Sequence, residues 1–304
     1  MDAEPRASEQ RRVLRVGHSP DPDDAFMFFG LAHGHVRIRD FEIEHCLEEI
    51  DALNRRALAG ELDVTAISAH AYPAVAEHYW ILPTGASVGR GYGPVVVTRG
   101  GSAASGGGSA ATRGGPVPGL ASLAGQVVAL PGAMTTATLL AHLFIPGARF
   151  RQLPFDAILP AVRDGEVAAG VLIHEGQITY ADHGLAKVAD LGAEWEREEG
   201  LPLPLGLDVV RKTLGAALAR EIDAALRASI RYAIAHEEAA IEYALRFGRG
   251  VGADVGRRFV RMYVNDDTIA LPPEGRRALA RLYARAVSAG LLEREPAIEF
   301  VPGA

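Results

Sequence analysis

The sequence predicts an α/β protein built from two similar lobes, with a ligand-binding cleft between them. Short apolar stretches typical of buried strands alternate along the chain with segments at helical spacing. Part of this pattern occurs twice, since the stretch 60–68 (GELDVTAIS) resembles the stretch 165–173 (GEVAAGVLI) and a predicted helix precedes each. The length of 304 residues is enough for two domains of ordinary size.

The composition excludes several classes of function. Hydrophobic residues make up 48% of the chain and charged residues 23%, as in globular proteins, and a net charge of -7 gives no general attraction to nucleic acid. No apolar stretch approaches the ~18 residues of a membrane-spanning helix. Residues 1–12 lack the apolar centre of a secretory signal. We therefore expect a cytoplasmic protein without membrane insertion, and the sequence leaves its oligomeric state open.

The first lobe is expected to begin with a strand and a polar loop that contains two prolines. A buried helix should follow, with Asp23 or Asp24 either capping it or binding a ligand. The glycine-rich stretch 85–94 is no phosphate loop, but its small residues would let the backbone approach a ligand. The expected strands are 13–17, 41–45, 63–67 and 95–97, and the expected helices are 25–32 and 50–59.

The second lobe is expected to repeat the order of strands and helices. Its predicted strands are 127–130, 170–173 and 185–191, and its predicted helices are 135–145 and 156–163, the latter with Pro160 as a point of interruption. Alternate prolines in 200–210 disfavour a helix and indicate an extended crossing between lobes. We expect lobe 1 to comprise 13–97 and 207–304, and lobe 2 98–206, with a disordered tail at 1–12, a flexible Gly/Ser insertion at 99–119 and a mainly helical chain after 214.

The stretch 170–180 is the strongest candidate for catalysis. Its apolar start predicts a buried strand of a parallel sheet, which ends at His174 and Glu175. Ligands of open α/β sheets bind beyond the carboxyl ends of such strands, and an imidazole can gain or lose a proton near neutral pH. The alternative is that His174 only makes a structural hydrogen bond.

Further polar side chains are expected at the same cleft. Thr135 and Thr136 stand at a predicted helix start, where free backbone N–H groups and hydroxyls favour an anion, although a plain N-cap is the alternative. Ser68 ends a predicted strand, and Ser19 and Asp24 belong to the first polar loop. Two lobes would bring all of these residues together.

No metal site is expected. His174 and Glu175 are not followed by the spacing of a His-Glu-x-x-His motif. The pair His33 and His35 has no visible further ligands, and the single cysteine, Cys46, can form neither an intrachain disulfide nor a cysteine zinc site alone.

Four stretches resemble the 1,4-dihydroxy-6-naphthoate synthase family, which acts in the futalosine route to menaquinone. They are 19–26 (SPDPDDAF), 172–180 (LIHEGQITY), 200–206 (GLPLPLG) and 263–266 (YVND). The resemblance extends from residue 13 to residue 292, apart from the Gly/Ser insertion. It implies the type 2 periplasmic-binding-protein fold, with two α/β lobes around a cleft.

The resemblance also implies roles for individual residues. His174 corresponds to the family's proposed catalytic base, Thr135 and Thr136 to the hydroxyls that hold the substrate carboxylate, and Ser68 with the loop 19–24 to the opposing wall. The loop departs from the family, which has Cys, Asn and Thr where this chain has Asp21, Asp23 and Ala25. The added carboxylates make the mouth of the cleft more acidic and bear on the identity of the substrate.

The resemblance implies a carbon–carbon lyase that converts cyclic dehypoxanthine futalosine into 1,4-dihydroxy-6-naphthoate without a metal or redox cofactor. Its partner would be a small-molecule carboxylate substrate. The alternative is a non-catalytic binding or sensor protein of the same fold. The absence of an export signal and of a lipid-attachment cysteine near the N-terminus disfavours a transport role.

Overall fold

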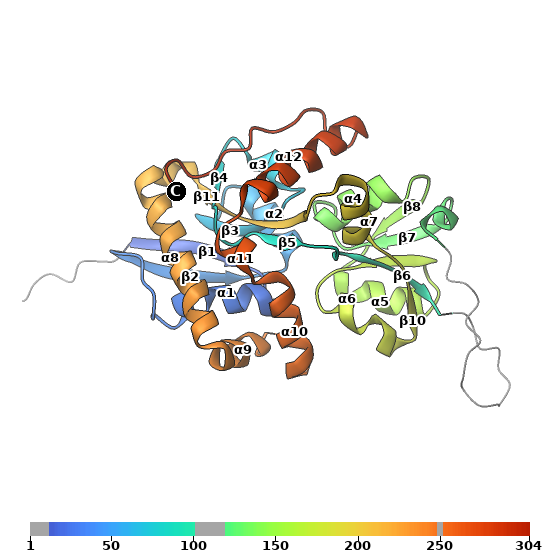
Figure 1. The fold of residues 1–304 in the computed structure, drawn as a ribbon, viewed down its shortest axis with the longest axis horizontal. Coiled ribbons are helices and arrows are strands. Elements are labelled where there is room, and N and C mark those ends of the chain that lie inside the picture. Colours follow the sequence, from blue (N-terminus) through green and yellow to red (C-terminus); the bar gives the residue numbers. More distant parts are fainter. Residues whose placement is uncertain (1–11, 101–118, 248–251) are drawn as a thin grey trace, which may run out of the picture.

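The protein folds into two α/β lobes that lie side by side (Figure 1). The structure is a computed structural model that describes residues 12–100, 119–247 and 252–304. The expected tail at 1–12 and the expected insertion at 99–119 therefore lie, apart from their edge residues, outside the described residues. Each lobe is built on one sheet, and we call the lobe that begins with β1 lobe 1 and the other lobe 2.

The sheet of lobe 1 has the strand order β2-β1-β3-β11-β4, and β5 also pairs with β11. β1 is parallel to β2 and β3, whereas β11 is antiparallel to β3, β4 and β5. A late segment of the chain thus occupies the interior of the first sheet. The strands are β1 (Arg12–His18), β2 (Phe41–Leu47), β3 (Val64–Ser68), β4 (Tyr79–Ile81), β5 (Ser87–Gly89) and β11 (Leu203–Arg211).

The sheet of lobe 2 has the order β10-β6-β9-β7-β8. The strand predicted before His174 is β9, and all four of its residues are buried. It is parallel to β7 but antiparallel to β6, so the sheet is mixed and not purely parallel as expected. The strands are β6 (Val95–Arg99), β7 (Val127–Leu130), β8 (Arg149–Gln152), β9 (Ala169–Leu172) and β10 (Leu185–Asp190).

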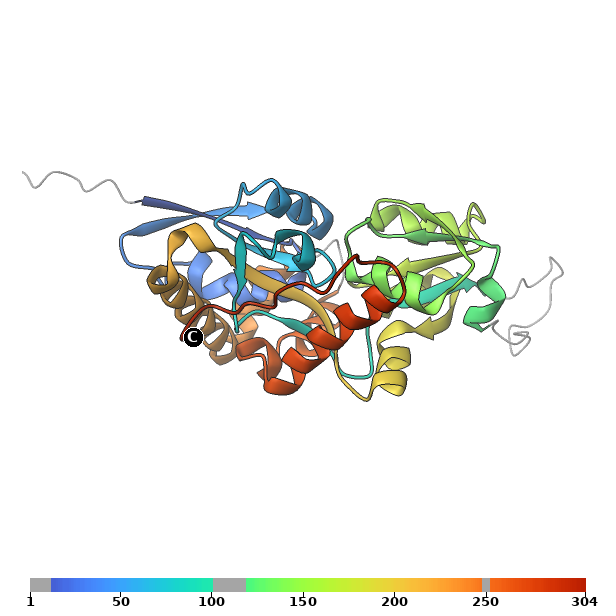
Figure 2. The same ribbon diagram turned by 90° about the horizontal axis from the view of Figure 1, so that it is seen from above.

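The helices cover the sheets, and α12 runs along one side of the molecule from lobe 1 to lobe 2 (Figure 2). Those of lobe 1 are α1 (Pro22–Ala32), α2 (Ile50–Leu58), α3 (Tyr72–Val75), α8 (Ala216–Ala235), α9 (Glu237–Leu245), α10 (Ala253–Tyr263), α11 (Asp266–Ile269) and α12 (Pro273–Ser288). Those of lobe 2 are α4 (Thr136–Phe144), α5 (Phe155–Arg163), α6 (Gly176–Thr179) and α7 (Leu191–Glu199).

The structure decides two points about helices that the sequence left open. Helix α1 starts at Pro22 with Asp21 as its N-cap residue, so neither Asp23 nor Asp24 caps it. Proline favours the first helical position, since its φ suits the helix and its missing N–H would have no partner there. Pro160 lies inside α5 without interrupting it, because the rest of this helix packs on the sheet.

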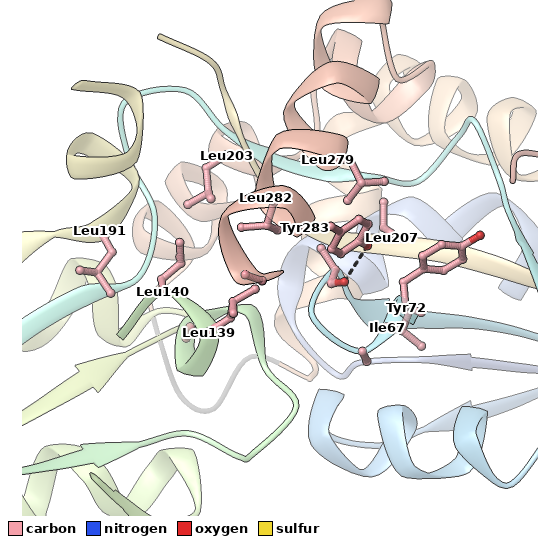
Figure 3. Packing of buried hydrophobic residues seen from close by; sticks show 14 of the residues in the cluster. Ile67, Tyr72, Leu139, Leu140, Leu191, Leu203, Leu207, Leu279, Leu282 and Tyr283 are labelled. Atoms are coloured by element: carbon pink, nitrogen blue, oxygen red, sulfur yellow. Dashed lines mark hydrogen bonds between the residues drawn. The ribbon is translucent and has the colours of Figure 1, made fainter. Parts of the chain in front are cut away.

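An apolar core joins the two lobes (Figure 3). Its side chains come from both sheets and from α12, and they include Ile67, Tyr72, Leu139, Leu140, Leu191, Leu203, Leu207, Leu279, Leu282 and Tyr283. The hydroxyl of Tyr283 donates a hydrogen bond of 2.8 Å to the carbonyl of Ala69. This shared core, which we call the interlobe core, fixes the lobes against each other on one side of the molecule.

A buried histidine pair lies at the end of β1. The ring of His18 is fully buried and stacks on Phe28 with a centroid distance of 4.4 Å, and its Nε2 lies 3.2 Å from Nδ1 of His45. Burial first, and then the neighbouring His45, lower the pKa of His18 to about 3. Between about pH 3 and pH 6.5, His18 is therefore mostly neutral in the folded protein, whereas an unfolded chain would mostly carry it protonated.

This pair predicts a loss of stability in acid. The folded-state pKa of His18 lies below its ordinary value of 6.5, so its contribution to stability is complete above that pH and falls as the pH drops toward about 3. Between pH 7 and pH 4.5 the expected loss is roughly 2–3 kcal/mol. Urea unfolding of wild type and His18→Gln at both pH values measures it. The variant should show a smaller difference between the two pH values, and equal differences would contradict the prediction.

Candidate active site

A cleft that is partly open to solvent lies between the two sheets, and the empty space in it, including the part that opens to solvent, is about 720 Å³. Side chains from both lobes line it. Lobe 1 contributes Asp21, Asp23, Asp24, Ser68, Phe259 and Tyr263, and lobe 2 contributes Thr135, Thr136, His174 and Gln177.

His174 lies two residues after Leu172, the last residue of β9, in the wall of the cavity. Its φ of 57° makes it one of two non-glycine residues with positive φ in the described ranges. Such a conformation is uncommon and often occurs at functional sites. The ring packs edge-on against Phe155 at a centroid distance of 4.9 Å, and Nδ1 lies 2.8 Å from Oδ2 of Asp21 in lobe 1.

The loop between β1 and α1 presents its carboxylates to the cavity in a fixed arrangement. Oδ2 of Asp21 accepts a hydrogen bond of 2.7 Å from the hydroxyl of Ser19, and Oδ2 of Asp24 accepts one of 2.8 Å from the backbone N–H of Ser19. Asp24 lines the cavity, as its sequence position led us to expect. Ser19 is buried and lies behind the wall, where it orients Asp21 and Asp24.

Burial raises the pKa of several carboxyl groups near this wall of the cavity. Burial first, and then the charge of Asp21, raise the pKa of Asp24 to about 6. Burial, followed by Asp24 and Asp21, raises the pKa of Asp23 well above its usual value. Asp208 of β11 is also buried, and burial followed by Asp24 raises its pKa in the same direction. This side of the cavity can therefore hold protons near neutral pH.

Thr135 and Thr136 begin α4 at the opposite wall. Thr135 is the N-cap residue, since its hydroxyl accepts from the N–H of Thr138 and donates to the carbonyl of Gly132. The hydroxyl of Thr136 donates to the carbonyl of Leu205 at 2.7 Å. The hydroxyl proton of Thr135 is thus taken by the carbonyl of Gly132 or the hydroxyl of Thr138, and that of Thr136 by a carbonyl, so backbone N–H groups at the start of α4 are the donors that remain for an anion.

Ser68 lies at the end of β3 and lines the cavity. The side chain of Asn54 forms two hydrogen bonds with it, donating to its hydroxyl at 3.1 Å and accepting from its backbone N–H at 2.9 Å. Five of the six residues selected from the sequence therefore line one cavity, namely Asp24, Ser68, Thr135, Thr136 and His174.

A second polar contact across the cavity was not predicted from the sequence. The hydroxyl of Tyr263, at the end of α10, donates a hydrogen bond of 2.8 Å to Oε1 of Gln177 in α6. Both residues belong to stretches that carry the resemblance, 263–266 and 172–180. Only the structure shows that their side chains are in contact. Together with Asp21 and His174, they bridge the two lobes at the cavity.

Within the described ranges, no group of three or more His, Cys, Asp or Glu side chains could hold a metal ion. Every helix of these same ranges is also too short or too polar to cross a membrane.

Two α/β lobes around a cavity define a protein of the periplasmic-binding-protein fold. The structure is similar to that of an alkanesulfonate-binding protein from Xanthomonas axonopodis, with a TM-score of 0.67, coverage of 99% of this chain and 98% of the other, and 14% sequence identity. Similarity at this identity shows the fold alone. The predicted two-lobed fold is thereby confirmed.

The chain belongs to the menaquinone biosynthesis family, whose model matches residues 14–288. It is 41% identical to a 1,4-dihydroxy-6-naphthoate synthase from Thermus thermophilus, over 95% of this chain and 99% of that protein. A synthase of the same name from Streptomyces coelicolor is 37% identical, over 92% of this chain and 95% of that protein. A solved protein from Archaeoglobus fulgidus is 45% identical, with a TM-score of 0.83, over 94% of this chain and 100% of the other. The resemblance predicted from the sequence is confirmed.

Proposed function

We propose that this protein is a cytoplasmic lyase that converts cyclic dehypoxanthine futalosine into 1,4-dihydroxy-6-naphthoate in menaquinone biosynthesis. The observation that carries the proposal is the identity of 41% with a synthase of that name along nearly the whole of both chains. The cavity with His174 at its wall supplies a site for the reaction.

In this proposal the substrate carboxylate binds at the start of α4, where Thr135 and Thr136 stand and the helix dipole favours an anion. Ser68, with the loop that holds Ser19 and Asp24, forms the opposing wall. The lobes thus bind the substrate from two sides.

His174 acts as the general base and removes a proton next to the substrate carbonyl. Fragmentation of the spiro-ring carbon skeleton then releases the sugar portion and leaves an aromatic product. Formation of the aromatic ring drives the reaction, so that a redox cofactor or metal is not needed. General base catalysis of this kind is typically worth about 10²–10⁴ in rate, and orientation in the cavity adds to it.

A turnover assay tests the proposal. Purified protein and cyclic dehypoxanthine futalosine are mixed in buffer treated to remove metals, and 1,4-dihydroxy-6-naphthoate is followed by chromatography. We expect product from the wild-type protein at a rate that addition of metal does not change. Binding of the compound without product would instead indicate a binding or sensor protein. Absence of binding would mean that Asp21 and Asp23 direct the cavity to another ligand.

A further inference from the structure

We propose that Asp21 is a positioning residue that reaches His174 from the other lobe and fixes its neutral ring as the Nδ1–H tautomer. His174 would then have its carboxylate partner only when the two lobes are close enough for this contact. This inference rests on the proposed role of His174 as the general base.

The first support is the geometry of the contact. Nδ1 of His174 and Oδ2 of Asp21 are 2.8 Å apart, and the two side chains are only 11% and 5% exposed. With Asp21 ionised, as the proposal requires, its oxygens can only accept hydrogen bonds, and the proton of this contact belongs to Nδ1. A neutral imidazole with its proton on Nδ1 has its lone pair on Nε2, and Nε2 is then the atom that can take a proton.

The second support is that both partners are held independently. The hydroxyl of Ser19 donates to the same Oδ2 of Asp21 at 2.7 Å, and the backbone N–H of Asp21 points back to that hydroxyl at 3.3 Å. The edge-on contact with Phe155 holds the ring of His174 from another side. Because Ser19 holds Asp21 and Asp21 holds His174, the ring of His174 keeps one orientation through the reaction.

The third support is the position of the contact in the fold. Asp21 follows β1 of lobe 1, whereas His174 follows β9 of lobe 2. Tyr263 and Gln177 form a second hydrogen bond between the lobes at the same cavity. Separation of the lobes by a few ångströms would break both contacts, so closure of the cavity and orientation of the base are one event.

Spectroscopy tests the tautomer directly. Imidazole ¹⁵N chemical shifts distinguish a protonated from an unprotonated ring nitrogen, and His174→Asn identifies the signals of His174 among those of the 10 histidines. We expect the wild-type protein at neutral pH to show Nδ1–H, and Asp21→Asn to show a mixture that includes Nε2–H. A wild-type ring protonated on Nε2, or the same tautomer in both proteins, would overturn the proposal.

Kinetics test the consequence. In Asp21→Asn we expect kcat to fall by about 10²–10⁴-fold, as when an orienting carboxylate is removed from a catalytic histidine, with KM within about threefold. Ser19→Ala should lower kcat less, because Asp21 remains but loses one support. Asp164→Asn, which removes an exposed carboxylate at the end of α5, is the matched control and should retain wild-type kcat. An unchanged kcat in Asp21→Asn, or a change confined to KM, contradicts the inference.

The two proposals can fail separately. A wild-type protein without turnover contradicts the proposed function, whereas the ¹⁵N measurement still decides whether Asp21 sets the tautomer of His174. Should Asp21→Asn not fold, Ser19→Ala serves in its place, since a weakened support of Asp21 should broaden the tautomer mixture. A Ser19→Ala spectrum identical to that of wild type then overturns the proposal.

Discussion

Replacement of His174 by Asn is expected to lower kcat by about 10²–10⁴-fold while substrate binding is largely retained. An amide can still donate a hydrogen bond to Asp21, but it cannot take up a proton at neutral pH. Asn also tolerates the positive φ of 57° at this position better than most residues, so the backbone of the site should persist. The fall in kcat would therefore reflect the loss of a proton-accepting group and not a change in the fold.

The measurement compares turnover and substrate affinity in three proteins. His78→Asn is the matched control, because this histidine is exposed and lies outside the cavity. We expect wild-type activity from the control, near-wild-type affinity from both variants, and a kcat lowered by about 10²–10⁴-fold in His174→Asn alone. Turnover by His174→Asn within a few-fold of wild type would remove His174 from its proposed role.

Replacement of Trp195 by Ala is expected to lower the free energy of unfolding by about 3–5 kcal/mol, the usual cost of removing a large buried aromatic side chain. Trp195 belongs to α7, is fully buried in the interlobe core and donates from Nε1 to the carbonyl of Pro202 at 3.1 Å. The change leaves a void where the two lobes meet and removes the partner of a buried carbonyl.

The chain provides an internal control, since Trp80 is its only other tryptophan and is only partly buried. Urea denaturation followed by circular dichroism should show a loss of about 1–2 kcal/mol for Trp80→Ala, because less apolar surface leaves the core. In each variant the remaining tryptophan reports one lobe by fluorescence. If the free energy of unfolding fell equally in the two variants, Trp195 in the interlobe core would contribute no more to stability than Trp80.

The sequence predicted most elements because the periodicity of apolar residues is a local signal. The buried run before His174 is β9, and the proline-rich crossing is β11. Glycine and proline marked the turns between them. The expected positions of Ser68, Thr135 and Thr136 followed from strand ends and a helix start, which are also local features.

What the sequence did not predict depends on contacts between distant segments. Asp21 stood out only as an additional carboxylate, and nothing near it in the chain indicates that His174 lies 2.8 Å away. The bridge between Tyr263 and Gln177 was missed for the same reason. Periodicity also could not show that β6 runs antiparallel to β9, because a fully buried strand looks alike in either pairing.

The position of β11 between β3 and β4 has a consequence for the order in which a ribosome-bound chain can fold. All strands of lobe 2 follow one another in the chain and have been synthesised once Asp190 is made, whereas the sheet of lobe 1 needs β11, which ends at Arg211. Lobe 1 also closes on the C-terminal segment, where Phe300 forms a β-bridge with Ile81. The lobe that is synthesised first is therefore the last to be completed, and until then β3 and β4 expose edges that must be kept from pairing with other chains.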